Sequence, residues 1–163
     1  MREPSRSTAT AEELVLFEQS GERYALRSSV VREVLRAFSF VPLPKAPPIV
    51  EGLINLRGEI LPLLNTRRRF GLSDRPLSLS DHFIIAWQGS RWIALRVDRV
   101  LNLERLPIYK ASEQGKYIAG NELVAGVAQT PDGMILIQDL ARFLSAAETE
   151  ALSAALSEME KQR

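Results

Sequence analysis

Residues 50–65 of the chain read VEGLINLRGEILPLLN, and this stretch decides how the rest of the sequence is interpreted. Two largely apolar runs flank the tripeptide Arg57-Gly58-Glu59. Short apolar runs separated by a polar tripeptide that contains glycine predict two β-strands joined by a turn. A short polar helix over 66–70 is expected to follow, because Asn65 stands where it can cap that helix.

The same order of elements occurs twice along the chain. The sequence FEQSGERYAL at 17–26 resembles AWQGSRWIAL at 86–95, and the run 52–70 has a counterpart in the second half of the chain. Residues 14–71 and 81–144 therefore read as two copies of one unit. Short strands of this kind are expected to curl into small barrels, which leave no exposed edge. The sequence predicts an all-β fold of two pseudo-symmetric five-stranded β-barrels, one for each unit.

The two ends of the chain differ from these units. Residues 1–12 are polar and lack apolar periodicity, so we expect a flexible tail there, followed by one domain over 13–163. Ser145 and Glu148 have the spacing of a capping box, and the apolar periodicity that follows predicts an amphipathic helix over 146–161. Two interpretations of this helix stay open: a lid packed over the barrels, or a helix that binds a partner.

Composition narrows the classes of function. The 163 residues carry 21 Lys and Arg against 20 Asp and Glu, so no strong positive field attracts nucleic acid or an anionic membrane. The chain has no Cys, which excludes thiolate chemistry and fits a reducing compartment. No stretch approaches the ~20 apolar residues of a transmembrane helix, so we expect no direct membrane insertion. These features predict a cytoplasmic protein.

Candidate catalytic and metal-binding residues are scarce. The one histidine, His82, follows Asp81 at a predicted strand start, and we interpret the two as an exposed strand-end pair. A metal site would need clustered ligands, and a phosphate site would need a glycine-rich loop after a strand; the sequence has neither pattern. The basic run 67–69 is interpreted as a solvated helix face. The sequence therefore predicts neither an enzyme nor a bound cofactor.

Two polar residues of the opening stretch are candidates for partner binding. The guanidinium of Arg57 could project from the turn and bind the carboxylate or carbonyl groups of a partner. Asn55, two positions earlier, would share its face on a regular strand. Both side chains could instead satisfy the backbone of the turn, and the residues alone leave these alternatives open.

The run 50–65 closely resembles the signature of the CheW family, in which N-L-R-G is followed by apolar residues and a proline. The segments 42–47 and 95–101 are also similar to that family, and the resemblance extends from Leu14 to about Leu156. It implies two small barrels of the SH3 type. It also implies a non-catalytic adaptor that bridges the cytoplasmic tips of chemoreceptors and the regulatory domain of a CheA-type histidine kinase. Such an adaptor would be recruited to membrane-associated receptor arrays, where it could self-associate weakly.

The resemblance carries individual residues over as well. Arg57 stands at the family's partner-binding arginine, and Val100 falls in a segment similar to part of the receptor-binding groove. Core packing is the alternative for the two valines of the set. The predicted receptor-binding or kinase-binding residues are Val31, Glu33, Asn55, Arg57, Gly58 and Val100.

Two other functions stay open at this level. The first is a coupling protein of the same family in a chemosensory system that controls pili, biofilm or second-messenger output. The second belongs to another class, a β-barrel module that binds single-stranded nucleic acid or a small ligand. The near-neutral charge argues against nucleic acid.

Overall fold

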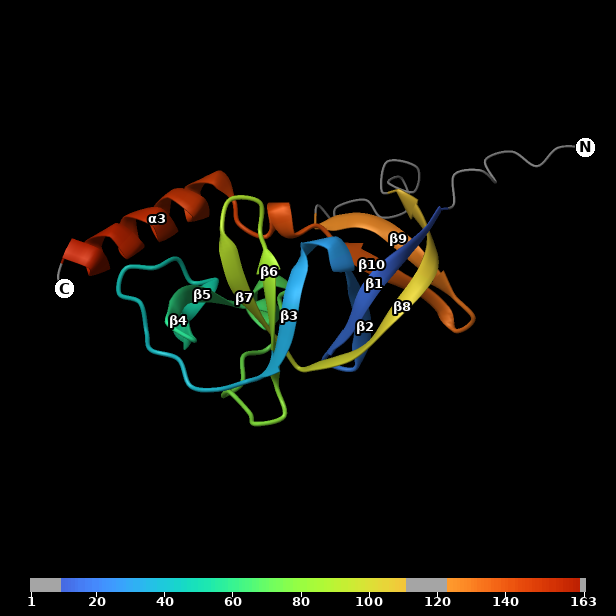
Figure 1. Ribbon diagram of the computed structural model, residues 1–163, viewed down its shortest axis with the longest axis horizontal. Helices are drawn as coiled ribbons and strands as arrows, with labels where there is room; N and C mark the ends of the chain where they lie inside the picture. The colour runs from blue at the N-terminus through green and yellow to red at the C-terminus, as the bar shows by residue number, and fades with distance from the viewer. Residues whose placement is uncertain (1–9, 111–122, 162–163) are drawn as a thin grey trace, which may run out of the picture.

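The fold, seen in a computed structural model that describes residues 10–110 and 123–161, consists of two five-stranded sheets lying side by side (Figure 1). The first sheet is a closed barrel in the order β1-β2-β10-β9-β8, and the second has the order β3-β6-β7-β5-β4. The strands of the first are β1 (Thr10–Gln19), β2 (Glu22–Arg27), β8 (Arg99–Lys110), β9 (Val124–Thr130) and β10 (Gly133–Gln138). Those of the second are β3 (Val31–Arg36), β4 (Val50–Leu56), β5 (Glu59–Asn65), β6 (His82–Trp87) and β7 (Trp92–Val97). The all-β prediction is confirmed.

The division of the chain into one barrel for each unit is wrong. The first barrel takes β1 and β2 from the first unit and β8, β9 and β10 from the second, and the second sheet combines β6 and β7 with β3, β4 and β5. Each unit therefore gives its first hairpin to the other unit's sheet. The sequence could not show this exchange, because β2 and β7 pair in parallel with equivalent strands, β10 and β5.

The pseudo-symmetry extends to the irregularities of the strands. A bulge separates Val31 from Glu33 where β3 pairs with β6, and an equivalent bulge follows Val100 where β8 pairs with β1. Val31 lies opposite Ala86 and Val100 lies opposite Phe17. Because Ala86 and Phe17 correspond in the sequence repeat, the two candidate valines occupy equivalent positions in the two sheets.

Two glycines mark the seams where the sheets close. A Cβ atom at Gly126 would lie 2.6 Å from the carbonyl oxygen of Tyr109, and one at Gly52 would lie 2.1 Å from that of Val41. The first seam is a regular strand pair between β8 and β9. The second is a single bridge between Val41 and Leu53. Prolines 42, 44, 47 and 48 follow Val41 and have no N–H to donate, so the second sheet closes less completely than the predicted barrel.

The N-terminal boundary also differs from the prediction. Strand β1 begins at Thr10, which lies opposite Ile108 of β8, so residues 10–12 belong to the barrel and not to a flexible tail. Residues 1–9 lie outside the described part. Polar residues can occupy this strand end because their outward faces remain exposed.

The short helices follow the turn chemistry of the sequence. Helix α1 (Thr66–Arg69) is capped by Asn65, whose side-chain oxygen accepts a hydrogen bond from the Arg68 N–H at 3.1 Å. Asp139 caps η4 (Leu140–Arg142) in the same way, and η2 (Ser28–Val30) precedes β3. The predicted cap at Asn65 is therefore present.

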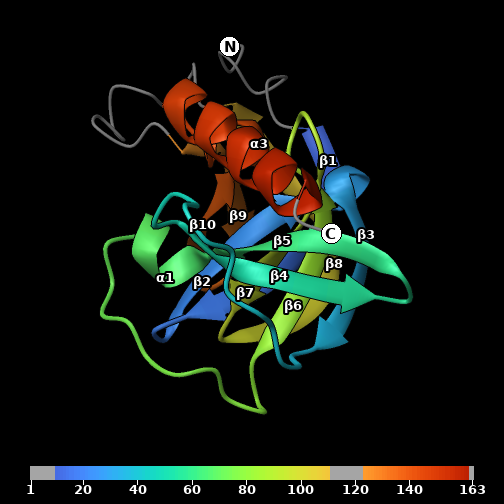
Figure 2. The same ribbon diagram turned by 90° about the vertical axis from the view of Figure 1, so that its left-hand side faces the viewer.

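The C-terminal helix α3 (Ala146–Lys161) lies across the second sheet and the segment before β4 (Figure 2). Ser145 and Glu148 form the predicted capping box through two hydrogen bonds of 2.9 and 3.1 Å. Leu152 and Ala155 are buried in an apolar cluster that includes residues of both sheets. The lid interpretation of the helix is confirmed by this packing.

Candidate functional site

The β4–β5 turn presents the arginine of the signature run. Arg57 has a φ of 52° and Gly58 a φ of 90°, and positive φ at both central residues is typical of a type I′ hairpin turn. The Asn55 side chain accepts a hydrogen bond from the Gly58 N–H at 2.8 Å. Asn55 thus satisfies the turn backbone, whereas Arg57 is left to project from the tip with 67% of its side chain exposed.

Strand β3 supplies the partners of this turn. Arg57 Nη2 lies 2.6 Å from Glu33 Oε2, and Arg32 Nη2 lies 3.0 Å from Glu59 Oε1. The guanidinium of Arg32 also stacks 4.9 Å from the ring centroid of Trp92. We call these five residues the hairpin cluster. It fixes the turn against β3, and the hairpin reaches toward that strand in Figure 2.

Exposed apolar side chains lie next to the hairpin cluster. Ile60, which pairs with Asn55, is 43% exposed. Trp87 is 41% exposed and packs edge-on against Trp92 with ring centroids 5.3 Å apart. Charged groups beside partly exposed aromatic and aliphatic side chains are typical of protein interfaces.

The structure brings four of the six predicted residues together: Glu33, Asn55, Arg57 and Gly58. Val31 begins the same strand as Glu33, but its side chain packs against the central apolar cluster, as does that of Val100. Both valines are only half-buried. They lie near opposite ends of β6, because Val31 pairs with Ala86 and the Val100 N–H donates to His82 Nδ1 at 3.3 Å.

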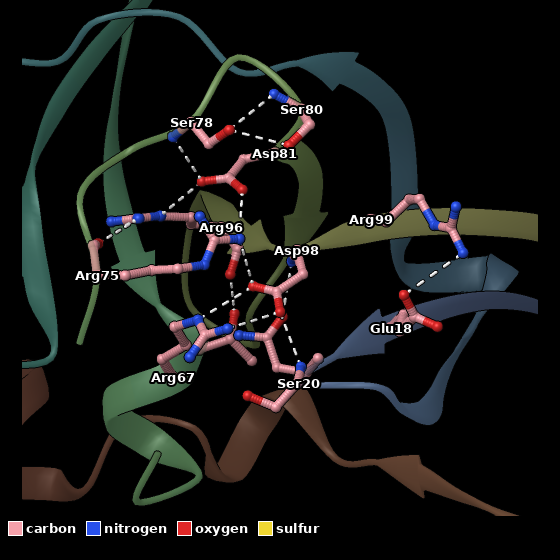
Figure 3. Close-up of polar contacts among 12 residues, drawn as sticks. Glu18, Ser20, Arg67, Arg75, Ser78, Ser80, Asp81, Arg96, Asp98 and Arg99 are labelled. Atoms are coloured by element: carbon pink, nitrogen blue, oxygen red, sulfur yellow. Dashed lines mark hydrogen bonds and ion pairs between the residues drawn. The ribbon is translucent and has the colours of Figure 1, made fainter. Parts of the chain in front are cut away.

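A buried charge network, which the sequence interpretation missed, lies where the two sheets meet (Figure 3). Arg96 is 3% exposed and Asp81 is fully buried, and Arg96 Nε lies 3.3 Å from Asp81 Oδ2. Arg96 Nη1 contacts both carboxylate oxygens of Glu51, at 2.8 and 2.7 Å. Arg75 Nη2 reaches Asp81 Oδ1 at 2.7 Å. Burial of these charges is tolerated because each one is paired.

Asp98 connects the network to the first barrel. Its carboxylate binds Arg67 at 2.8 Å and Arg75 at 2.9 Å, and it accepts a hydrogen bond from the Ser20 N–H at 2.8 Å. The Asp98 N–H donates to the Gln19 side chain at 2.8 Å. Burial alone would raise the pKa of the Asp98 carboxyl, but the bonds from Arg67 and Ser20 and the charge of Arg75 lower it. The two sheets are thereby joined by ionic as well as apolar contacts.

Two interpretations of charged residues are wrong. Asp81 is buried and is not an exposed strand-end residue, and His82 beside it is half-buried. Burial and the positive charges of Arg36 and Arg99 lower the pKa of His82, whereas the negative charge of Asp81 acts to raise it. The run 67–69 is not a freely solvated face, since each arginine has a carboxylate partner. Asp74 is only six residues from Arg68, but Asp98 and Glu148, the partners of Arg67 and Arg69, lie in distant segments that no local pattern could indicate.

Within residues 10–110 and 123–161, no group of three or more His, Asp or Glu side chains is arranged to hold a metal ion. No helix in this described part is long and apolar enough to cross a membrane.

Comparison with known proteins gives consistent matches. A family model described as "CheW-like domain" matches residues 13–148. The chemotaxis protein CheW of Treponema pallidum (strain Nichols) is 26% identical over 147 residues, which cover 86% of each chain. Protein FrzA of Myxococcus xanthus is 31% identical over 97 residues, covering 60% of this chain and 61% of FrzA. The crystal structure of scaffolding protein TtCheW from Thermoanaerobacter tengcongensis matches with a TM-score of 0.72 and 29% identity, covering 85% of this chain and 96% of TtCheW.

Proposed function

The chain belongs to the CheW-like domain family, and from this premise we propose that it is a non-catalytic scaffold that couples chemoreceptors to a CheA-type histidine kinase. The family model spans both sheets, and the similar solved structure is itself described as a scaffolding protein. A scaffold acts by geometry and needs no nucleophile, acid–base pair or metal. The sequence offers no such constellation.

The observation that carries the proposal is the β4–β5 turn. A type I′ turn with a non-glycine first residue holds Arg57 in a backbone region that most side chains avoid. The hairpin pairing and the contact with Glu33 hold the turn in place, while two-thirds of the arginine side chain remains exposed. An arginine positioned in this way is suited to bidentate contact with a partner's carboxylate or backbone carbonyls.

The mechanism follows from the way the two sheets are joined. Because Asp98 ties the β1–β2 turn to α1, and one apolar cluster includes residues of both sheets, relative movement of the sheets would break polar contacts and expose apolar surface. Two partners bound to different sheets would therefore be held in fixed register. We propose that the hairpin cluster contacts one partner and that the surface around Val100 contacts the other.

Assembly is proposed to take place in the cytoplasm, at arrays of membrane-bound receptors. Exposed ion pairs and half-buried apolar residues give modest pairwise affinities. Many weak contacts in an array sum to a tight assembly through high effective concentration. A single copy of the scaffold would then dissociate readily from one partner, whereas a copy that contacts several neighbours in an array would be retained there.

The proposal can be tested by co-sedimentation with a receptor cytoplasmic fragment and a kinase regulatory domain. The wild-type protein should bind both partners at the same time, and Arg57→Glu should lose one of them. Arg142→Glu is a matched control, because Arg142 is 63% exposed and forms an ion pair with a nearby carboxylate, Asp139. Failure of the wild-type protein to bind either partner would contradict the proposed function.

A further inference from the structure

Two arginines occupy equivalent positions in the pseudo-symmetric fold. Arg27 ends β2, and Arg96 stands at the corresponding place in β7, where each pairs with the equivalent residue of the preceding strand. Each arginine uses Nε to bind an acidic residue from the start of its own hairpin. Arg27 binds Glu12 at 2.7 Å, and Arg96 binds Asp81 at 3.3 Å. The two arginines therefore have the same local arrangement on one side.

On the other side the two arginines differ. Arg96 Nη1 also binds both carboxylate oxygens of Glu51, the extra residue of the β4 bulge. The extra residue of the equivalent bulge in β9 is Ala125. Among the described residues, Glu12 is the one carboxylate that forms an ion pair with Arg27. Arg27 thus lacks the second carboxylate that its counterpart has.

An open cavity lies where that carboxylate is missing. Its volume is about 240 Å³, and Arg27, Ala125, Val30, Trp87 and Leu140 are among the residues that line it. The equivalent space beside Arg96 is filled, and Arg96 itself is 3% exposed. The cavity is therefore lined by an arginine together with several apolar residues.

We propose that this cavity binds the carboxylate of an acidic side chain presented by a protein partner. The terminal nitrogens of Arg27 would bind the carboxylate as Arg96 binds Glu51, while Trp87 and Leu140 pack against the methylene groups. The volume is below the ~300–1,000 Å³ of typical small-molecule pockets, which favours a single inserted side chain. This inference deepens the proposed function and rests on it for the identity of the partner, but not for the chemistry of the cavity.

The acidic residue on the cavity wall does not occupy this position. Asp139 accepts a hydrogen bond from the Ala141 N–H at 3.1 Å and pairs with Arg142 at 3.5 Å. Its carboxylate is thus engaged in capping η4. Gln88, also on the wall, donates to the carbonyl oxygens of Leu140 and Ala141 at 3.4 Å. Arg27 is the lining residue that can neutralise an incoming carboxylate.

The chemistry can be tested without any partner. The probe is N-acetyl-L-glutamic acid α-amide, added to the ¹⁵N-labelled protein at constant ionic strength, with the corresponding glutamine amide as the neutral control. The Arg27 Nε–H and Trp87 indole signals should shift saturably, with an affinity about tenfold higher for the acid than for the amide. Equal affinities, or no saturable shift at these two groups, would overturn the proposal.

Ala125→Glu places in β9 the residue that β4 has at the same bulge, and it should abolish the response to the probe. Arg27→Gln provides a second variant, which should lose the discrimination between acid and amide. An unchanged response in a folded Ala125→Glu protein would count against the site.

In co-sedimentation, Ala125→Glu should weaken the binding of one partner about tenfold. If the wild-type protein couples both partners and this variant couples them equally well, the partner contact is wrong although the proposed function stands. If the probe binds but the wild-type protein couples nothing, the proposed function fails and the carboxylate site stands.

Discussion

Arg57 can stabilise the fold through its ion pair with Glu33, and it can also bind a partner. Reversing the charges of both Arg57 and Glu33 distinguishes these two roles. The pair is 2.6 Å long, but the arginine is 67% exposed, so its contribution to the free energy of unfolding should be about 0.2–1 kcal/mol. Truncating or reversing a charge that becomes buried in an interface costs about 2–5 kcal/mol, which is about 30-fold to several-thousand-fold in affinity. The two roles therefore differ in magnitude as well as in the observable that they change.

We expect Arg57→Glu to weaken binding of one partner by at least about 30-fold while lowering the free energy of unfolding by no more than about 1 kcal/mol. The double variant Glu33→Arg with Arg57→Glu rebuilds this ion pair within the molecule, so it should recover part of that stability. The recovery is partial because Arg32 Nε, 3.6 Å from the same Glu33 oxygen, loses its partner. It should not recover binding, because the charge offered to the partner remains reversed. Calorimetric titration with each partner and urea unfolding measure the two quantities. Recovery of binding in the double variant would refute the reasoning and show that Arg57 acts by holding the hairpin to β3.

Two further predictions concern the seams and the charge network. Gly52→Ala should destabilise the fold by about 2–4 kcal/mol, because its Cβ would lie 2.1 Å from the carbonyl oxygen of Val41. Gly126→Ala should destabilise the fold less, because its Cβ would lie 2.6 Å from the carbonyl oxygen of Tyr109. A urea midpoint that Gly52→Ala leaves unchanged would contradict the close approach. Since the pKa of Asp98 is lowered in the folded protein, its stabilising effect is complete above the ordinary aspartate value and is lost as the pH falls below about 4. Asp98→Asn should therefore flatten the fall of the free energy of unfolding in acid, measured by urea unfolding between about pH 5 and pH 3, and an unaltered slope would show that Asp98 is not responsible.

The elements of the fold could be predicted because their signals are local. Apolar runs and glycine turns located the strands around 50–65, and the side chain of Asn65 predicted the start of α1. The assignment of strands to sheets could not be predicted in the same way. The hairpin of β1 and β2 could pair with β5 of its own unit or with the equivalent strand β10 of the other unit. The sequence repeat is therefore compatible with sheets formed within one unit and with sheets that exchange hairpins between the units.

The candidate site was predictable to the extent that it lies on one hairpin. Arg57 and Gly58 stand in a turn that the sequence shows directly. The partner of Arg57, Glu33, is 24 residues away on a strand whose pairing is a tertiary property. The burial of Asp81 was missed for a related reason, since Arg75 and Arg96, which neutralise it, come from separate segments. Arg75 is only six residues away, but it lies outside any regular strand or helix, so its spacing to Asp81 does not indicate that the two side chains meet.

The exchange of hairpins has a consequence during synthesis on the ribosome. The β1–β2 hairpin ends at Arg27, but its partner β10 ends at Gln138, so 138 − 27 = 111 further residues must be translated before the first barrel can close. At about 5–20 residues per second this takes roughly 6–20 s. Throughout that time the nascent hairpin has unpaired edges, and its acidic side chains at 12, 13 and 18 oppose pairing with neighbouring nascent chains. The second sheet differs, because its five strands are consecutive in the chain and all of them precede β8. A product released before β8 would therefore contain the strands of the second sheet but only the β1–β2 hairpin of the first barrel, and its unpaired edges would be open to proteases.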